Sequence, residues 1–274
     1  MFCKVTDQLD RLVELNALPQ RIISLVPSQT ELLVDLGLKD RLVGITRFCI
    51  HPQGLTDEVK VMGGTKKIVR DRLYELQPDL IICNKEENTP EIVEFCDQVA
   101  PTYISDVNTL DDAVEMINDL GILTGTSFKA KALSRKIKMS FNNLDKLEAK
   151  KVLYLIWKDP YMTVGKGTFI NDIINTSGLI NVAEEMSRYP ELTMDQMVTL
   201  QPDLIFLSSE PYPFQEEDIE TFKKAFTLAP PQHHVKPNVE PNIILVDGEM
   251  FSWYGSRLLK SAQYFENLKV QINS

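Results

Sequence analysis

The sequence is poor in the residues on which metal sites depend. Its only histidines are His51, His233 and His234, and a zinc or manganese site needs three or four converging ligands. His51 is a weak candidate for a ligand to a metal ion that is already bound in a chelate. The alternative is that His51 is an ordinary loop histidine. The His233-His234 pair lies in a proline-rich stretch, which is typical of a surface loop. A bare metal ion is therefore disfavoured as the ligand.

Motifs for nucleophilic catalysis and nucleotide hydrolysis are also missing. The sequence has no Gly-x-Ser-x-Gly motif, and Gly165-Lys166 lacks the upstream glycine of a phosphate-binding loop. The cysteines form no Cys-x-x-Cys pair and have no zinc-ligand spacing; they are Cys3, Cys49, Cys83 and Cys96. We expect no catalytic residue and no intrinsic cofactor, and hence a protein that is not an enzyme.

Long apolar runs are absent, and no stretch reaches the length of a transmembrane helix. The first twenty residues lack the apolar core of roughly 7–15 residues found in signal peptides. We expect either a cytoplasmic protein or a translated start that differs from the one given. The formal net charge of -10 would repel phosphate backbones, so nucleic acid is excluded as a partner. The simplest meaning of this charge is solubility.

Strand-like and helix-like segments alternate along the chain. The strands are expected at residues 21–26, 42–45, 79–83, 151–156, 203–207 and 242–246. The helices are expected at residues 29–38, 69–76, 91–99, 111–120, 127–147, 168–176, 195–200, 218–226 and 257–268. This alternation predicts an α/β fold with parallel sheets that are covered on both faces.

An internal repeat divides the chain into two halves. Residues 71–81 (DRLYELQPDLI) match residues 195–205 (DQMVTLQPDLI) at seven of eleven positions. Two copies of the segment predict two lobes with the same fold. The alternative is that a common helix-to-strand connection arose twice independently. Between the copies, residues 127–147 contain no proline or glycine and predict a helix of roughly 30 Å.

Three segments of the chain resemble a known protein family. Residues 21–38 (RIISLVPSQTELLVDLGL), 80–88 (LIICNKEEN) and 157–169 (WKDPYMTVGKGTF) resemble the helical-backbone substrate-binding proteins of ABC importers, most closely the cobalamin-receptor branch. The resemblance implies two Rossmann-like lobes with parallel sheets, bridged by a single long α-helix, and a ligand in the cleft between them. The expected division is an N-terminal extension (1–20), a lobe (21–124), a bridging helix (125–149) and a second lobe (150–274).

Polar residues at strand ends are the first candidate ligand contacts. Ser28 and Gln29 begin a helix, where free N–H groups favour an anionic group of a ligand. The alternative is a capping box between Ser28 and Glu31. Asn84 and Lys66 lie in loops that follow strands or glycines and could contact a polar rim of the ligand, or could simply be solvated.

Aromatic residues in loops after strands are the second group. Flat rings suit a macrocycle because they bury a large area with little loss of rotamer freedom. The candidates are Phe48, Trp157, Tyr161, Tyr189, Phe251 and Trp253. The resemblance places Phe48 and Tyr189 at ligand-facing positions, whereas Met162 replaces an aromatic residue of the cobalamin receptors. Ordinary packing is the alternative for each ring.

Asp71 and Asp195 occupy the same position in the two copies of the repeat, each at the start of a short helix. Helix dipoles favour carboxylates there. In the resembling importers a glutamate at each place docks onto arginines of the permease, and aspartate is one methylene shorter.

The leading hypothesis is a monomeric binding protein that delivers a corrinoid, haem or ferric siderophore to an ABC permease–ATPase complex. One alternative is a cytoplasmic carrier or sensor of the same fold, which the N-terminal sequence favours. Another is a chelatase-like tetrapyrrole enzyme, which would need a histidine and a carboxylate at the ligand. The resemblance implies export, so the sequence and the family disagree on the compartment.

Overall fold

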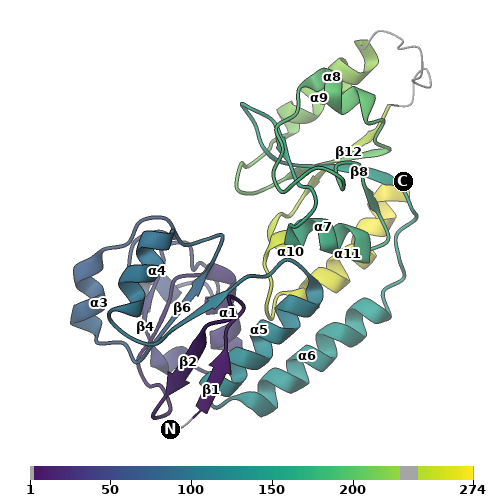
Figure 1. The fold of residues 1–274 in the computed structure, drawn as a ribbon. Coiled ribbons are helices and arrows are strands. Elements are labelled where there is room, and N and C mark those ends of the chain that lie inside the picture. The colour runs from purple at the N-terminus through teal and green to yellow at the C-terminus, as the bar shows by residue number, and fades with distance from the viewer. Residues whose placement is uncertain (1–2, 229–239, 274) are drawn as a thin grey trace. The chain divides into compact units, whose positions relative to one another are not determined.

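A computed structural model describes residues 3–228 and 240–273 of the chain. The chain forms two compact units (Figure 1). Unit 1 runs up to Met139 and includes Tyr254–Leu259, and unit 2 contains Ser140–Trp253 and the chain from Lys260 onwards. The expected boundary at residue 150 assigns Tyr254–Leu259 to the second lobe, whereas this segment packs within unit 1.

The elements follow the expected alternation. Those of unit 1 are β1 (Cys3–Thr6), β2 (Leu12–Leu15), β3 (Ile22–Ser24), α1 (Pro27–Asp35), η1 (Lys39–Arg41), β4 (Leu42–Ile45), α2 (Leu55–Glu58), β5 (Lys60–Val61), α3 (Arg70–Leu76), β6 (Leu80–Asn84), α4 (Pro90–Asp97), β7 (Thr102–Ser105) and α5 (Leu110–Leu123). Helix α6 (Ser127–Asn142) begins in unit 1 and ends in unit 2. Those of unit 2 are β8 (Lys151–Trp157), β9 (Met162–Thr163), α7 (Phe169–Thr176), β10 (Ile180–Asn181), α8 (Met194–Thr199), β11 (Leu204–Ser208), α9 (Glu216–Leu228), β12 (Asn242–Val246), α10 (Glu249–Ser252) and α11 (Leu258–Asn273), whose first two residues belong to unit 1.

The main sheets of the two units share the order of four parallel strands, with β4-β3-β6-β7 in unit 1 matching β10-β8-β11-β12 in unit 2. The sheet of unit 1 has the order β5-β4-β3-β6-β7, and all its neighbouring strands are parallel. The sheet of unit 2 has the parallel order β10-β8-β11-β12, with β9 antiparallel to β8. In each unit the first strand of the sheet lies centrally, as the predicted repeat requires.

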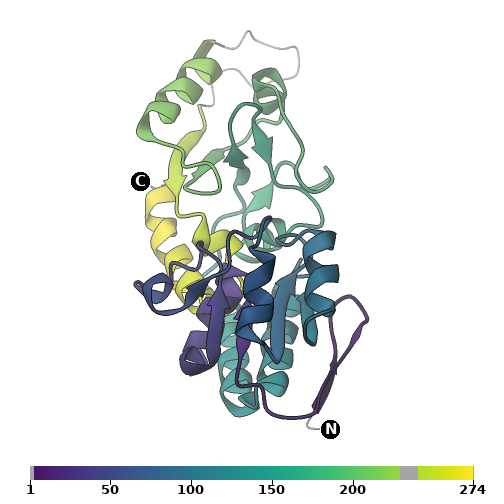
Figure 2. The same ribbon diagram turned by 90° about the vertical axis from the view of Figure 1, so that its left-hand side faces the viewer.

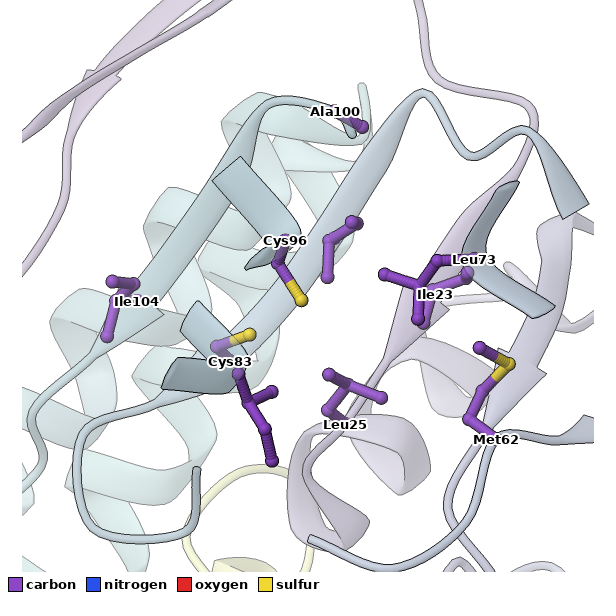
Figure 3. Packing of buried hydrophobic residues seen from close by; sticks show 10 residues of the cluster. Ile23, Leu25, Met62, Leu73, Cys83, Cys96, Ala100 and Ile104 are labelled. Atoms are coloured by element: carbon purple, nitrogen blue, oxygen red, sulfur yellow. The ribbon is translucent and has the colours of Figure 1, made fainter. Parts of the chain in front are cut away.

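Both faces of the unit 1 sheet are covered. Side chains alternate along each strand, so Ile23 and Cys83 pack with Leu73 of α3 and Cys96 of α4 on one face (Figure 3). On the other face, the hydroxyl of Tyr103 reaches Asp119 of α5. Burial on both faces explains why the strands are almost uninterrupted apolar runs.

The two copies of the repeat form the same joint in the structure. Gln77 and Gln201 both adopt the left-handed conformation, with φ of 43° and 49°, and the proline that follows each cannot extend the helix. The carboxylate of Asp79 then accepts the N–H of Arg21 at 2.9 Å, and that of Asp203 accepts the N–H of Lys151 at 2.8 Å. Each aspartate thus ties the amino end of its strand to that of the neighbouring strand.

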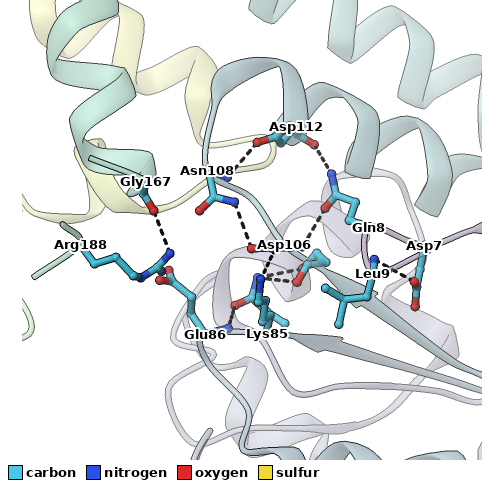
Figure 4. Close-up of polar contacts among 12 residues, drawn as sticks. Asp7, Gln8, Leu9, Lys85, Glu86, Asp106, Asn108, Asp112, Gly167 and Arg188 are labelled. Atoms are coloured by element: carbon cyan, nitrogen blue, oxygen red, sulfur yellow. Dashed lines mark hydrogen bonds and ion pairs between the residues drawn. The ribbon is translucent and has the colours of Figure 1, made fainter. Parts of the chain in front are cut away.

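The first twenty residues contain a β-hairpin that sequence patterns did not predict. Strands β1 and β2 pair antiparallel (purple in Figures 1 and 2), and the loop between them contacts the edge strand β7. Asp7 accepts the N–H of Ile104 at 3.3 Å, and Gln8 accepts the N–H of Asp106 at 3.0 Å (Figure 4). These side chains satisfy backbone donors of an edge strand that would otherwise be open.

Helix α6 ends earlier than the sequence pattern predicts. The expected helix extends to residue 147, whereas the observed helix ends at Asn142. After it, the N–H of Asp145 bonds to the carboxylate of Glu266 at 3.0 Å, and that of Leu147 bonds to the carbonyl of Ser177 at 2.8 Å. These two N–H groups therefore bond to residues elsewhere in unit 2 and do not extend the helix.

A buried ion pair holds the segment Tyr254–Leu259 in unit 1. The guanidinium of Arg257 meets the carboxylate of Glu31 through two bonds, at 2.8 and 2.9 Å, and both side chains are at most 6% exposed. The expected capping box of Ser28 and Glu31 is therefore wrong, because Val26 is the N-cap residue without a side-chain bond and Glu31 binds Arg257.

We predict that Glu31→Gln lowers the free energy of unfolding by about 3–5 kcal/mol, because it leaves a buried guanidinium without its counter-charge. Urea denaturation checks this. Lys39→Ala, which breaks an exposed ion pair with Glu58, serves as the control and should cost less than about 1 kcal/mol. The combined variant Glu31→Leu, Arg257→Met should recover most of the loss. Equal stability of Glu31→Gln and the natural protein would contradict the prediction.

Asp119 gives unit 1 a pH-dependent stability. Burial raises the pKa of its carboxyl to about 6; the hydroxyl of Tyr103 opposes this, and the carboxylates of Glu115 and Asp7 add to it. Between about pH 4 and 6 the folded state thus binds more protons than the unfolded state, so stability falls as pH rises through this window.

We predict that Asp119→Asn raises the free energy of unfolding by about 1 kcal/mol at pH 7.5, after allowance for solvent screening, and has no effect at pH 4. Thermal unfolding at the two pH values measures the difference. The control is Asp40→Asn, which alters an exposed carboxylate of the same unit. A gain of equal size at both pH values would argue against titration of Asp119 as the cause.

Candidate ligand-binding site

The carboxyl ends of the parallel strands define the candidate site in each unit. In open α/β sheets, ligands bind at this edge, where the loops after the strands gather. In unit 1 these loops are residues 46–50 after β4, 62–69 after β5 and 85–89 after β6. In unit 2 they are residues 158–161 after β8, 182–191 after β10 and 209–215 after β11.

Asn84 shapes the end of β6 from the inside. It is 2% exposed, and its amide nitrogen donates to the carbonyl and hydroxyl of Ser105 at 3.1 and 3.0 Å. Its side-chain oxygen accepts the N–H groups of Glu86 and Glu87 at 2.8 and 3.0 Å. The structure therefore gives Asn84 a turn-forming role, and the expected ligand contact stays a prediction.

Ser28 and Gln29 lie in the first turn of α1 and are both buried. The side-chain amide of Gln29 donates to the hydroxyl of Ser105, so Gln29 and Asn84 meet at the same serine. Because Gln29 is fully buried, its predicted contact with a ligand is not supported. The N-terminus of α1 was predicted to bind an anionic group of the ligand, and Gln29 exposes no side-chain surface there.

Phe48 and Lys66 belong to two loops that are bonded to each other. The N–H of Arg47 donates to the carbonyl of Gly63 at 2.8 Å, which joins the loop after β4 to the loop after β5. The ring of Phe48 is 45% exposed, and the ammonium of Lys66 donates to the carbonyl of Glu86. The structure thus leaves the Phe48 ring accessible at the carboxyl edge of unit 1.

In unit 2, Trp157 is the last residue of β8 and is 39% exposed, with its ring edge-on to Tyr212 at 5.9 Å. Tyr161 is half-buried against Phe222, with ring centroids 5.2 Å apart, and burial raises the pKa of its hydroxyl. Tyr189 is half-buried under the guanidinium of Arg188. These rings retain accessible surface.

Phe251 does not offer a ring face to a ligand. It is fully buried among aromatic side chains of unit 2, with centroids 5.0 Å from those of both Tyr154 and Phe265. Its predicted ligand contact stays untested, and the structure shows the ring as part of the aromatic core. Trp253 is buried as well, and its indole N–H donates to the carboxylate of Glu210 at 3.1 Å.

Glu210 is a feature that sequence reasoning missed. Its carboxylate also accepts the hydroxyl of Ser252 at 2.6 Å. Burial raises the pKa of this carboxyl, and the carboxylates of Glu249 and Asp247 add to the shift. No local sequence signal connects Glu210 to Trp253, because the two residues meet only when the carboxyl ends of β11 and β12 are brought together.

Asp71 and Asp195 keep the symmetry that the repeat predicts. Each is the second residue of its helix, α3 or α8, and each is exposed. Thr193 and Gln196 form a capping box at the start of α8, so the carboxylate of Asp195 is not needed as a cap. Docking by the two aspartates stays a prediction.

Metal-binding groups are scarce in the part of the chain that the structure describes. Within residues 3–228 and 240–273, no three or more histidine, cysteine and acidic side chains are grouped to hold a metal ion. His51 is half-buried, and the His233-His234 pair lies outside the described residues. No helix among the described residues has the length and apolar character to cross a membrane.

Comparisons with known proteins agree with this architecture. The family model for periplasmic binding proteins matches residues 22–231. An uncharacterised ABC transporter substrate-binding lipoprotein of Bacillus subtilis is 24% identical over 256 residues, which cover 89% of this chain and 80% of the relative. A vitamin B12-binding protein of Vibrio parahaemolyticus is 27% identical over 198 residues, covering 69% and 70%.

Solved structures share the fold at low sequence identity. The periplasmic vitamin B12-binding protein BtuF of Vibrio cholerae has a TM-score of 0.70 at 18% identity, covering 94% of this chain and 99% of that one. The periplasmic haem-binding protein HutB of Vibrio cholerae has a TM-score of 0.75 at 21% identity, covering 91% and 98%. Because the family model spans most of the chain, this protein belongs to the periplasmic binding protein family.

Proposed function

We propose that this protein is the substrate-binding component of an ABC importer and that its ligand is a bulky metal chelate, namely a corrinoid, haem or a ferric siderophore. The match to the periplasmic binding protein family over residues 22–231 carries the proposal. Relatives are named as B12-binding proteins and as an ABC transporter lipoprotein, and structural neighbours as B12- and haem-binding proteins.

The accessible aromatic rings support a large, flat ligand. Phe48 and Trp157 expose 45% and 39% of their surfaces in loops at the carboxyl edge of their sheets, and Tyr161 and Tyr189 keep part of theirs. Rings held in this way bury area against a macrocycle at little entropic cost. Binding alone needs no reaction at the ligand, and the family is one of binding proteins.

A chelatase-like activity is the weaker candidate. Insertion of a metal into a tetrapyrrole needs a base for the pyrrole protons and side chains that deliver the metal. The described residues contain no cluster of three or more histidine, cysteine and acidic side chains that could hold it. Incubation with a free porphyrin and Zn²⁺ tests this, since metallation changes the absorption bands of the porphyrin.

We predict that the purified protein retains at least one chelate through gel filtration after incubation with cyanocobalamin, hemin or a ferric siderophore in turn. Absorption spectra of the protein fraction identify the retained chelate. Phe48→Ala and Tyr189→Ala should each weaken its binding roughly tenfold, since each removes a ring worth about 1–2 kcal/mol. Phe128→Ala, at a ring on α6 that is 88% exposed, is the matched control and should bind normally. Retention of none of the chelates would refute the proposed function.

Docking onto a permease rests on Asp71 and Asp195. Each carboxylate is exposed at the second position of a helix, once in each unit, so charge and placement are duplicated as a symmetric permease would require. Exposed carboxylates on helices of this kind can pair with arginines of a partner.

We predict that Asp71→Lys combined with Asp195→Lys abolishes stimulation of the ATPase of the reconstituted cognate importer, because attraction to arginines becomes repulsion. Each single variant should lose part of the stimulation, and ligand affinity should not change. Glu75→Lys makes the same change of charge at an exposed site on α3 and serves as the control. Full stimulation by the double variant would instead favour the carrier or sensor without an importer.

A further inference from the structure

Two exposed apolar side chains lie on α3 close to Asp71, the residue predicted to dock onto a permease. Val69, the residue before the helix, is 42% exposed, and Tyr74 is 56% exposed. Tyr74 follows Asp71 by three residues, so its ring and the carboxylate are neighbours on the surface of one helix. Apolar surface beside charged groups is a common feature of sites at which proteins bind one another.

Phe95 of the neighbouring helix α4 holds the Tyr74 ring in place. Helices α3 and α4 lie side by side in unit 1 (Figure 1), and the ring centroids of Tyr74 and Phe95 are 5.5 Å apart at an interplanar angle of 89°. The guanidinium carbon of Arg70, one turn before Tyr74, lies 4.8 Å from the Phe95 centroid. Phe95 is half-buried against the core of unit 1. The Tyr74 ring is thus positioned before a partner arrives, which lowers the entropic cost of binding.

The second copy of the repeat shows that the fold does not require an exposed ring at this position. The match between residues 71–81 and 195–205 pairs Tyr74 with Val198. Val198 is 8% exposed and belongs to the buried side of α8. The same helix-to-strand joint therefore forms around a buried aliphatic side chain in unit 2 and a largely exposed aromatic one in unit 1.

The residue before the helix differs between the units in the same way. Thr193 caps α8 in unit 2, because its hydroxyl accepts the N–H of Gln196 at 3.3 Å. Val69 occupies the equivalent position before α3 and provides no side-chain cap. Unit 1 thus exposes an apolar side chain where a polar one would stabilise the helix. Departures from a local rule of this kind are expected at functional sites.

We propose that Val69, Tyr74 and Phe95, together called the α3 patch, anchor the permease of the importer, and that the equivalent positions Thr193 and Val198 of unit 2 provide no such anchor. This inference rests on the proposed function and adds apolar contacts to the docking predicted for Asp71. The matching surface of the permease is an apolar pocket for the Tyr74 ring beside an arginine for the carboxylate. Tyrosine is among the residues that contribute most to affinity at protein interfaces, so unit 1 should provide the larger share of the docking energy.

The affinity of the protein for the reconstituted cognate importer tests the inference. Tyr74→Ala should weaken binding by roughly tenfold or more, because it removes the ring that enters the pocket. Tyr74→Phe keeps the ring and should stay within about threefold of the natural protein. Phe128→Ala is the matched control, since it removes a ring that is 88% exposed on α6, and should bind the importer normally. Circular dichroism should show the same folded structure for all three variants.

Val69→Thr separates docking from folding. It gives α3 the type of capping residue that α8 has, so thermal unfolding should move to higher temperature. The same change replaces an apolar methyl group of the α3 patch with a hydroxyl, so binding to the importer should weaken about threefold. Damage to the fold cannot explain a variant that is more stable and docks less well.

Equal affinity of the natural protein and Tyr74→Ala for the importer would overturn the inference and leave the proposed function intact. A comparable loss in Phe128→Ala would also overturn it, because the effect would then not be specific to the α3 patch. If the natural protein itself did not bind the importer, the proposed function would fail, and the inference with it.

Discussion

Parallel pairing of the strands is the constraint on which the rest of this structure depends. Parallel neighbours must be joined by crossovers, so all the parallel strands of a sheet end at the same edge, and the loops that follow them lie there. Asp79 and Asp203 fix this arrangement from the opposite edge, because their carboxylates bond to backbone N–H groups at the start of the neighbouring strands. One short joint, used in both units, thus determines which side chains can meet a ligand.

This constraint also explains how much of the fold the sequence could predict. Long apolar strands, the helices between them and the repeated Gln-Pro-Asp joint have local signals, and their positions agree with the structure to within a few residues. The two-residue strands β5, β9 and β10 are too short for periodicity to reveal. The hairpin of β1 and β2 depends on Asp7 and Gln8 meeting β7, and the bond between Glu31 and Arg257 spans 226 residues of sequence. Contacts between residues so far apart in sequence produce no signal in the local sequence.

In the candidate site, too, some features have local sequence signals and others depend on contacts between distant residues. The predicted strand at residues 42–45 places Phe48 in the loop after β4, as the structure does, but a sequence pattern could not predict which way a side chain points. Asn84 and Gln29 turn inward, and the side-chain amides of both donate to the hydroxyl of Ser105. Phe251 likewise completes an aromatic core. Phe48 remains 45% exposed although the guanidinium of Arg47 covers one face of its ring.

The net negative charge of the chain and its cationic strand-end loops are compatible, because electrostatic attraction at a binding site is local. At physiological ionic strength the screening length is about 8 Å, so carboxylates on distant faces contribute little at Arg47, whereas Lys66 and Lys67 lie in the adjoining loop. Under the same screening, the exposed carboxylates of Asp71 and Asp195 act mainly on groups that approach their own helices. The side chains within a screening length of a surface, and not the net charge of the whole molecule, therefore set the potential at that surface.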